Sequence, residues 1–409
     1  MVDTFPMPLD PIARAGPAGP ATRPFASAEP AGHALPITFS GSGSEYFRIW
    51  IVNLLLTLVT LGLYYPWAKV RRLRYFYGNT SVGGHTLDFH GEPKRMLRGF
   101  VLVGVLLLVY LMAGKVSPAA GLVALLIVAG VWPALFRASQ QFRMANTSWR
   151  GLRFRFNGDQ GGAYRAMLPL FIPGVLTLAA VLFAGAPAGA ARAASALAML
   201  TGVASVLLFP LFLWLLKKYQ HDHYALGQVQ TQLRTGAGSF YAVAVKTIGV
   251  SLLAAVVAGA AAALVGGFAA LGQMFGKGGD GRGGAAMVIA VMVLLFSVYV
   301  AAAVVVQPYV TSRLQNLVWG RTWSRHLRFE SDLRFWPLLR LTLKNWALIL
   351  LTLGLYGPFA KIAMARLRLE AVTVHSLLAP DELVSTLRER VHDASGDAAG
   401  DLFGIDIGL

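Results

Sequence analysis

The chain has 409 residues, of which 56% are hydrophobic and only 13% are charged. A soluble domain carries about 45–50% apolar and about 25% charged residues, so this composition excludes a water-soluble enzyme and a disordered chain. The net charge is +17, and the absence of cysteine excludes disulfides, thiolate metal sites and a cysteine nucleophile.

The two ends of the chain differ from its middle. Residues 1–38 are rich in proline, alanine and glycine without a hydrophobic period, which predicts a disordered tail. No apolar run follows a basic start there, so we do not expect a signal peptide. Residues 376–409 form an acidic C-terminal tail, with a net charge of −5 from Pro380 onward. We expect a short helix near 380–392 and then a loose acidic end.

Six apolar runs between the tails are long enough to approach or exceed the span of a bilayer, which takes about 20 helical residues. They cover residues 97–113, 119–136, 166–186, 193–216, 247–275 and 285–306. We therefore predict an all-α polytopic membrane protein whose membrane domain covers residues 39–375, with about six to eight spans.

Two further apolar segments, 46–68 and 338–360, resemble each other. GLYYPWAK and GLYGPFAK share six of eight letters, and Asn53 and Asn345 occupy equivalent places. Two alternatives stay open for both segments. Each either crosses the bilayer fully, or dips into it and returns at Gly62 and Gly354 as a re-entrant hairpin.

Basic residues are distributed unevenly among the connections. The connections 69–98, 137–165, 217–246 and 307–344 hold 24 lysine and arginine residues, whereas the alternate connections hold four. Positive charge accumulates in cytoplasmic loops, so we expect the four long connections in the cytoplasm.

The four long connections also resemble one another. A proline ends each incoming span, and a threonine or tyrosine follows 14 residues later, at Thr80, Thr147, Tyr224 and Thr322. Alternation of Leu152, Phe154 and Phe156 with arginines has the period of two that is typical of a half-buried strand. We therefore predict short β segments within repeated cytoplasmic connections.

The stretch NLLLTLVTLGLYYPWAKVRRLRYFYGNTSVGGHTLDFHG at 53–91 resembles the signature of the YjgN family of bacterial inner membrane proteins, a domain of unknown function. The resemblance recurs in weaker form through about residue 375. It implies a multi-pass protein of the bacterial inner membrane and brings no established activity. The motif residues are Gly62, Pro66, Trp67, Lys69, Asn79, Thr80, Phe89 and Gly91.

Candidate chemistry is sparse. His221, Asp222 and His223 could ligate a metal, but a polar helix end explains them better. No acidic residue lies inside an apolar span, which disfavours a proton-driven carrier. We expect no enzymatic activity, no cofactor and no metal.

Two hypotheses for function follow. The first is a channel or transporter for a small solute, because paired, glycine-interrupted short hydrophobic segments are associated with membrane binding sites. Asn53, Tyr64, Asn345 and Tyr356 would then form its polar lining. The alternative is a non-transporting envelope scaffold, or a protein that interacts with lipid or other proteins.

The basic and small residues indicate the partners. Juxtamembrane basic residues attract anionic lipid headgroups, so we expect membrane lipids, and no nucleic acid, as partners. Small residues between Gly259 and Gly267 allow close helix packing, either within the chain or in a homo-oligomer.

Overall fold

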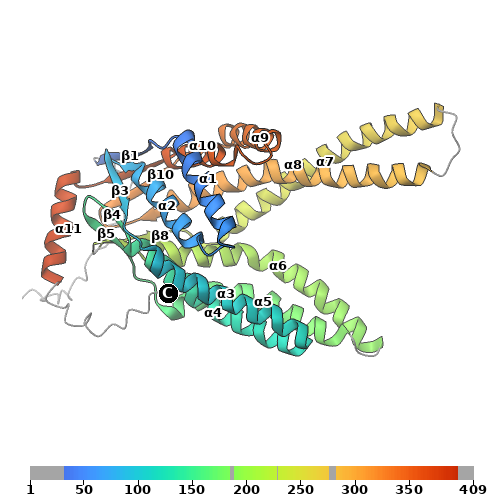
Figure 1. The fold of residues 1–409 in the computed structure, drawn as a ribbon, viewed down its shortest axis with the longest axis horizontal. Coiled ribbons are helices and arrows are strands. Elements are labelled where there is room, and N and C mark those ends of the chain that lie inside the picture. The colour runs from blue at the N-terminus through green and yellow to red at the C-terminus, as the bar shows by residue number, and fades with distance from the viewer. Residues whose placement is uncertain (1–31, 185–187, 228, 276–281, 395–409) are drawn as a thin grey trace, which may run out of the picture. The chain divides into compact units, whose positions relative to one another are not determined.

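The computed structural model describes residues 32–184, 188–227, 229–275 and 282–394, in which helices joined by short strands predominate (Figure 1). The helices are α1 (Gly43–Val59), α2 (Tyr65–Gly78), α3 (Pro93–Val116), α4 (Pro118–Ala145), α5 (Gln160–Ala184), α6 (Ala188–Asp222), α7 (Ala237–Phe275), α8 (Arg282–Trp319), α9 (Phe335–Leu351), α10 (Gly357–Glu370) and α11 (Pro380–Ala394). The strands are β1 (His33–Phe39), β2 (Thr80–Val82), β3 (His85–Phe89), β4 (Thr147–Trp149), β5 (Leu152–Phe156), β6 (Tyr224–Leu226), β7 (Val229–Gln230), β8 (Gln232–Leu233), β9 (Thr322–Trp323), β10 (Leu327–Ser331) and β11 (Val372–Ser376).

Each of five helix pairs leaves the sheet from one strand and returns to a strand that pairs with it. For example, β1 precedes α1 and α2, and β2 follows them; Ile37 of β1 lies opposite Val82 of β2. The same antiparallel pairing joins β3 to β4, β5 to β6, β8 to β9, and β10 to β11. The described residues thus contain five β-α-α-β units.

The five units join into one ring of strands. The order of neighbours is β7-β6-β5-β4-β3-β2-β1-β11-β10-β9-β8. The two ends of this order, β7 and β8, are separated in sequence only by Thr231, so the segment 229–233 pairs with β6 on one side and β9 on the other. The sheet therefore closes on itself, and β1 pairs with β11 to join the two ends of the chain.

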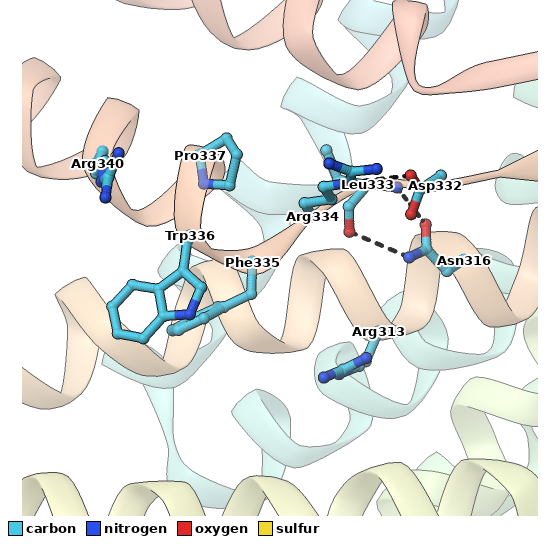
Figure 2. Close-up of a pocket in the computed structure, with 9 residues that line it drawn as sticks. All are labelled: Arg313, Asn316, Asp332, Leu333, Arg334, Phe335, Trp336, Pro337 and Arg340. Atoms are coloured by element: carbon cyan, nitrogen blue, oxygen red, sulfur yellow. Dashed lines mark hydrogen bonds and ion pairs between the residues drawn. The ribbon is translucent and has the colours of Figure 1, made fainter.

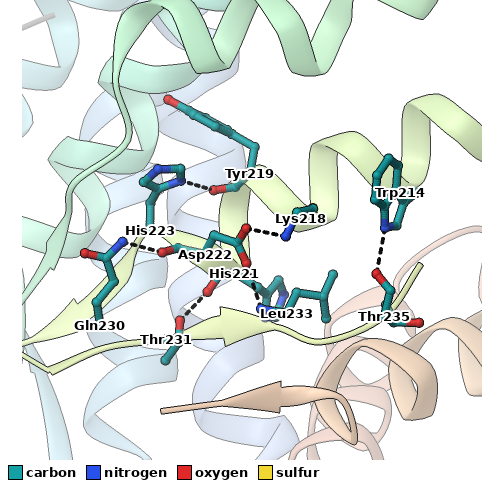
Figure 3. A network of polar contacts seen from close by, with 10 residues as sticks. All are labelled: Trp214, Lys218, Tyr219, His221, Asp222, His223, Gln230, Thr231, Leu233 and Thr235. Atoms are coloured by element: carbon teal, nitrogen blue, oxygen red, sulfur yellow. Dashed lines mark hydrogen bonds and ion pairs between the residues drawn. The ribbon is translucent and has the colours of Figure 1, made fainter. Parts of the chain in front are cut away.

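Polar contacts from the end of α6 hold the closing segment in place (Figure 3). The Asp222 carboxylate accepts hydrogen bonds from the Leu233 amide at 2.7 Å and from the Lys218 ammonium at 2.8 Å. The Thr231 hydroxyl donates to the His221 carbonyl. The Asp222 carboxylate thus satisfies the Leu233 amide, and the Thr231 hydroxyl satisfies a carbonyl at the end of α6, so both bonds tie the segment 229–233 to that helix.

Helix α11 covers an apolar core inside the ring. Leu383 and Leu387 are each 1% exposed and pack with residues contributed by distant strands. The buried strand residues of this cluster are Leu35, Trp149, Leu152, Leu226, Val229 and Val374. The expected helix near 380–392 is thus confirmed, and residues 395–409 of the predicted acidic end lie outside the described part.

Within the part of the chain that the structure describes, five helices are long and apolar enough to cross a membrane: Pro93–Val116, Ala120–Ala145, Gln160–Ala180, Arg192–Asp222 and Ala237–Ala260. Each overlaps one of the six predicted runs. The sixth run, 285–306, falls within α8, where many side chains lie outside the described part. The prediction of a mainly helical membrane protein is confirmed.

The two ambiguous segments form the short helix pairs α1–α2 and α9–α10. Because β1 pairs with β2, and β10 with β11, the chain leaves and re-enters the same ring on either side of each segment. Helices α1 and α9 have only 17 residues each, below the roughly 20 that a crossing needs. The longer pairs leave and re-enter the ring in the same way, so the choice between crossing and re-entry stays a prediction.

Three predicted span-ending prolines lie inside helices instead. Pro133, Pro210 and Pro308 lie within α4, α6 and α8, which continue for about three further turns before the ring. A proline removes only one helical hydrogen bond, and a helix held by tertiary packing can bend around it. Of the four prolines predicted to end a span, Pro66 alone lies at a helix boundary. It stands in the first turn of α2, where no amide donor is required.

The N-terminal boundary also differs from the prediction. Residues 33–38, which we assigned to the tail, lie in β1. Pro36 cannot donate to the ladder, but its carbonyl accepts a bond from the Gly83 amide at 3.1 Å. Residues 1–31 of the predicted tail lie outside the described part.

Candidate functional site: hairpin tips and an arginine-lined groove

The structure places the predicted polar-lining residues in two separate helix pairs. Asn53 of α1 is 8% exposed, and its Oδ1 accepts a hydrogen bond from Arg71 of α2 at 3.4 Å. Asn345 of α9 is 5% exposed, and its Nδ2 donates to the Ala360 carbonyl of α10 at 3.5 Å. Each asparagine therefore ties together the two helices of its own pair.

Tyr64 and Tyr356 lie at the tips of these pairs, immediately before α2 and α10. Their rings stack on Trp67 at 6.1 Å and on Phe359 at 5.5 Å between ring centroids. The role of the two tyrosines as a polar lining stays a prediction.

Both tips turn sharply through glycine. Gly62 and Gly354 each have φ +93°, and the preceding Leu61 and Leu353 have φ near +50°. Glycine adopts this left-handed backbone without the steric penalty that a Cβ would add. Leu61 and Leu353 are each 95% exposed, so the tips present apolar side chains outward.

The remaining family-motif residues have structural roles at the ring. The Asn79 side chain donates to the Tyr75 carbonyl at 2.8 Å, and the Thr80 hydroxyl to the Phe76 carbonyl at 2.7 Å. Asn146 and Thr147 make the equivalent bonds after α4. These side chains satisfy carbonyls that a helix end leaves without partners.

The F-x-G triplets reflect close packing. A Cβ added at Gly91 would lie 2.5 Å from the Phe89 ring, and one at Gly41 would lie 2.7 Å from the Phe39 ring. The phenylalanine thus covers the glycine two residues later, at the point where each strand leads into a helix. Glycine is required there because any larger residue would displace the ring.

A groove of about 760 Å³ lies where α8 passes the start of α9 (Figure 2). Three arginines and two aromatic residues dominate its lining. The residues are Arg313, Asn316, Asp332, Leu333, Arg334, Phe335, Trp336, Pro337 and Arg340.

The groove has an excess of positive charge. Asn316 is fully engaged, since its side chain bonds both the amide and the carbonyl of Leu333. Asp332 pairs with Arg334 at 3.1 Å. Arg313 lies over the Tyr309 ring at 5.4 Å, and Arg340 has an exposed side chain. Arg313 and Arg340 therefore remain as cations that face the groove without a carboxylate partner among the described residues.

The groove also has a membrane-interface character. Trp336 is 66% exposed beside the arginines. Tryptophan prefers the headgroup level of a bilayer, where its ring is apolar and its N–H can still meet water. Arginine binds phosphate through its planar fork of donors. Together these residues form a site that suits the phosphate of a lipid headgroup.

Sequence reasoning missed this groove as a site. Arg313, Arg334 and Arg340 were assigned only to a basic connection. The available signal was the stretch RFWPLLR at 334–340, in which arginines flank Phe335 and Trp336. Arg313 lies 21 residues earlier, so only the fold brings it to the same groove.

The side chains of His221, Asp222 and His223 make hydrogen bonds that stabilise the fold. His221 Nδ1 lies 2.9 Å from the Thr322 hydroxyl, which donates its own hydrogen to the Val318 carbonyl. His223 Nδ1 contacts the Tyr219 carbonyl at 2.7 Å, and Asp222 holds the closing strand. Among the described residues no group of three or more histidine, cysteine or acidic residues could hold a metal.

Curated relatives match part of the chain. It is 33% identical over 138 residues to the inner membrane protein YjgN of Escherichia coli K12, and 28% identical over 152 residues to that of Salmonella typhimurium. These matches cover 33% and 37% of this chain. They span only 34% and 38% of the relatives' own lengths. No solved structure matches.

The family comparison covers more of the chain. The relatives bear a name that places them in the inner membrane, and five helices here can span one, so this is an inner membrane protein. The sequence profile of the family described as bacterial protein of unknown function (DUF898) matches residues 34–402, and the chain belongs to that family.

Proposed function

We propose that this chain is a non-enzymatic, lipid-interacting protein of the inner membrane, which binds anionic phospholipid in the groove between α8 and α9. The observation that carries the proposal is the pairing of Arg313 and Arg340 with the exposed Trp336. An arginine near a membrane surface gains about 1 kcal/mol from anionic lipid. Two such residues in one groove favour an anionic over a zwitterionic headgroup.

The short helix pairs support a lipid-facing role. Exposed leucines at both tips would insert into the acyl region of the inner leaflet, since apolar side chains leave water favourably. Leu58, Val59 and Leu63 are 63%, 81% and 61% exposed in the first pair. Tyr64 and Tyr356 stand one turn behind, where aromatic residues prefer the interface. The pairs would then hold the ring against the cytoplasmic face.

The orientation follows from charge. The strand-bearing connections hold most of the basic residues, and positive charge stays on the cytoplasmic side. We therefore propose that the ring and α11 lie in the cytoplasm. Anionic lipid of the inner leaflet would then meet the groove at the ends of α8 and α9.

The experiment compares two double variants in purified protein. Arg313→Ala with Arg340→Ala removes both cations that face the groove without a carboxylate, and we expect phosphatidylglycerol to bind about 30-fold more weakly. Arg153→Ala with Arg155→Ala removes the same charge from exposed positions of β5 and serves as the control. Native mass spectrometry in a maltoside detergent counts bound phosphatidylglycerol and phosphatidylcholine. Equal loss in both double variants would reject the groove as the site.

A channel or transporter is the second candidate. Buried Asn53 and Asn345 in paired, glycine-interrupted segments favour it. Against it, the apolar windows of α3 and α6 are only 0% and 6% buried by the rest of the described chain. A sealed polar path would need further walls, from lipid or from a second copy in a homo-oligomer. Solute flux in proteoliposomes that falls in Asn53→Leu with Asn345→Leu would support transport.

A further inference from the structure

Six of the lysine and arginine residues on α2, α4, α6 and α10, four helices that lead into the ring, form a group. All six fall in the stretch between the buried proline of each helix and the strand that follows 14 residues after it. We call them the inner basic cluster. Its members are Lys69, Arg72, Arg143, Lys217, Lys361 and Arg368.

The ring brings these residues within electrostatic range of one another. The Lys217 ammonium is influenced by both Arg143 and Arg368. Lys69 is influenced by Arg72 and Arg143, and Lys361 by Arg72. The links therefore join all four helices, although their residues are separated by up to about 300 positions in sequence.

The repeat explains why the cluster converges. Lys69 and Lys361 each lie three residues after the proline of their helix, and Arg143 and Arg368 each lie ten residues after. Equivalent positions in neighbouring units of a closed ring lie at equivalent heights. Lys69 and Lys361 thus share one level, and Arg143 and Arg368 share a second level about two helical turns nearer the strands.

Buried glutamines supply the partners of three members. Gln140 Oε1 accepts from Arg143 at 2.7 Å, and Gln220 Oε1 from Lys217 at 3.1 Å. Gln315 Oε1 accepts from Arg368 at 2.9 Å. All three glutamines are at most 8% exposed. An amide oxygen orients a cation but carries no charge to neutralise it.

No carboxylate compensates the cluster within the described ranges. The acidic residues that form ion pairs there pair with other bases, and the nearby Asp222 holds Lys218. Arg143 Nε is buried without a hydrogen-bond partner. Grouped cations without a counter-charge are unfavourable because burial removes water and like charges repel. Burial together with Arg72 and Arg143 indeed lowers the pKa of Lys69.

We propose that the inner basic cluster binds a phosphate-bearing anion. A phosphate or diphosphate carries several negative charges and presents oxygens in several directions. It can therefore accept hydrogen bonds from donors that converge from four helices. Arginine and lysine are the residues that bind such groups. Lys361 and Arg368 keep exposed side chains, which leaves a route for the ligand. This proposal is independent of the groove between α8 and α9.

The test uses the full chain in maltoside detergent, with pyrophosphate as the probe. Thermal unfolding and isothermal titration calorimetry should show that pyrophosphate binds and raises the Tm more than chloride at equal ionic strength. Lys217→Gln should weaken binding about tenfold or more. It should also raise the Tm of the ligand-free protein, because a repulsive charge is removed. If Lys217 only supported the fold, its substitution would lower the Tm of the ligand-free protein.

Arg155→Gln is the control, since this arginine is exposed on β5 outside the cluster. It should keep the wild-type affinity, as should Arg313→Ala with Arg340→Ala, so the two proposals can fail separately. Equal Tm shifts by pyrophosphate and chloride, or unchanged binding in Lys217→Gln, would overturn the proposal.

A lipid headgroup and a soluble phosphate share this chemistry, and a competition arm separates them. Phosphatidylglycerol that displaces pyrophosphate from the wild type, and that is lost from Lys217→Gln, would identify the headgroup as the ligand. Pyrophosphate binding that is unaffected by phosphatidylglycerol would identify a soluble anion. Either result supports the site.

Discussion

Removal of two leucines from α11 should release this helix from the ring while the rest of the protein stays folded. Leu383, Val384 and Leu387 are the buried residues by which α11 joins the core inside the ring. Burial of each stabilises the docked helix by about 1.5–3 kcal/mol, or about 5–9 kcal/mol together. The ion pair between Arg150 and Asp381 adds little, since the Asp381 side chain is 88% exposed.

Each leucine-to-alanine change in a packed core costs about 2–5 kcal/mol. Leu387→Ala alone should therefore speed hydrogen exchange of the α11 amides about 100-fold, because local opening becomes about 3 kcal/mol easier. Leu383→Ala with Leu387→Ala removes about as much free energy as docking supplies. We then expect α11 to exchange almost without protection.

Hydrogen–deuterium exchange of the segment around α11, measured by mass spectrometry in detergent, is the assay. Ser385→Ala is the matched control, since Ser385 is exposed on the same helix and bonds only to Glu382. Asp381→Asn should likewise leave protection intact. Unchanged protection in the double variant would refute the packing argument. Equal loss of protection in the ring strands would show that α11 and the ring unfold as one unit.

Substitutions at three further positions, Gly91, Asp159 and Asn345, test the structure through the Tm in detergent. Gly91→Ala should lower the Tm, since its Cβ would approach the Phe89 ring to 2.5 Å. Gly236→Ala is the control and should leave the Tm unchanged, because a Cβ there would have no neighbouring atom within 4 Å. Asp159→Ala should cost about 1 kcal/mol by removing the cap at the Gly162 amide, 2.9 Å away. The Gly162 amide lowers the pKa of the Asp159 carboxyl. The contribution of this cap to stability is therefore complete above about pH 4 and is lost as the pH falls through the lowered pKa. Asp159→Asn should remove this pH dependence. Asn345→Leu should keep or raise the Tm, because Asn345 Oδ1 is buried without a partner and the bond from Nδ2 to the Ala360 carbonyl, at 3.5 Å, is long and weak; a large decrease would contradict this.

The spanning helices could be predicted because the bilayer fixes their length and composition. The 14-residue spacing from proline to strand was also visible, but only in four copies. A fifth copy runs from Pro358 to Val372, the first residue of β11. We missed it because Val372 departs from the polar pattern of Thr80, Thr147 and Thr322, and because its helix pair is too short to mark a span.

The closed ring could not be predicted from local patterns. Closure depends on β1 pairing with β11, where Ala34 lies opposite His375, and no local signal links positions so far apart. It also depends on Thr231, which divides one segment between two neighbours. Proline in 33–38 argued for a tail, although Pro36 lies in a strand. The groove and the inner basic cluster were invisible for the same reason, since each joins residues from separate units.

Closure of the ring changes the meaning of the basic residues. As a property of separate connections, their positive charge explains only which side of the membrane they occupy, and that role requires neither burial nor convergence. A sheet with open edges would let the helices diverge, whereas here the segment 229–233 pairs with β6 through β7 and with β9 through β8, which closes the strand order within the described residues. The ring therefore holds Arg143, Lys217 and Arg368 within electrostatic range of one another despite their repulsion. Exposed lysines would be enough to set the orientation of the chain in the membrane. The charges instead converge beside buried glutamines, and a bound ligand would explain this arrangement.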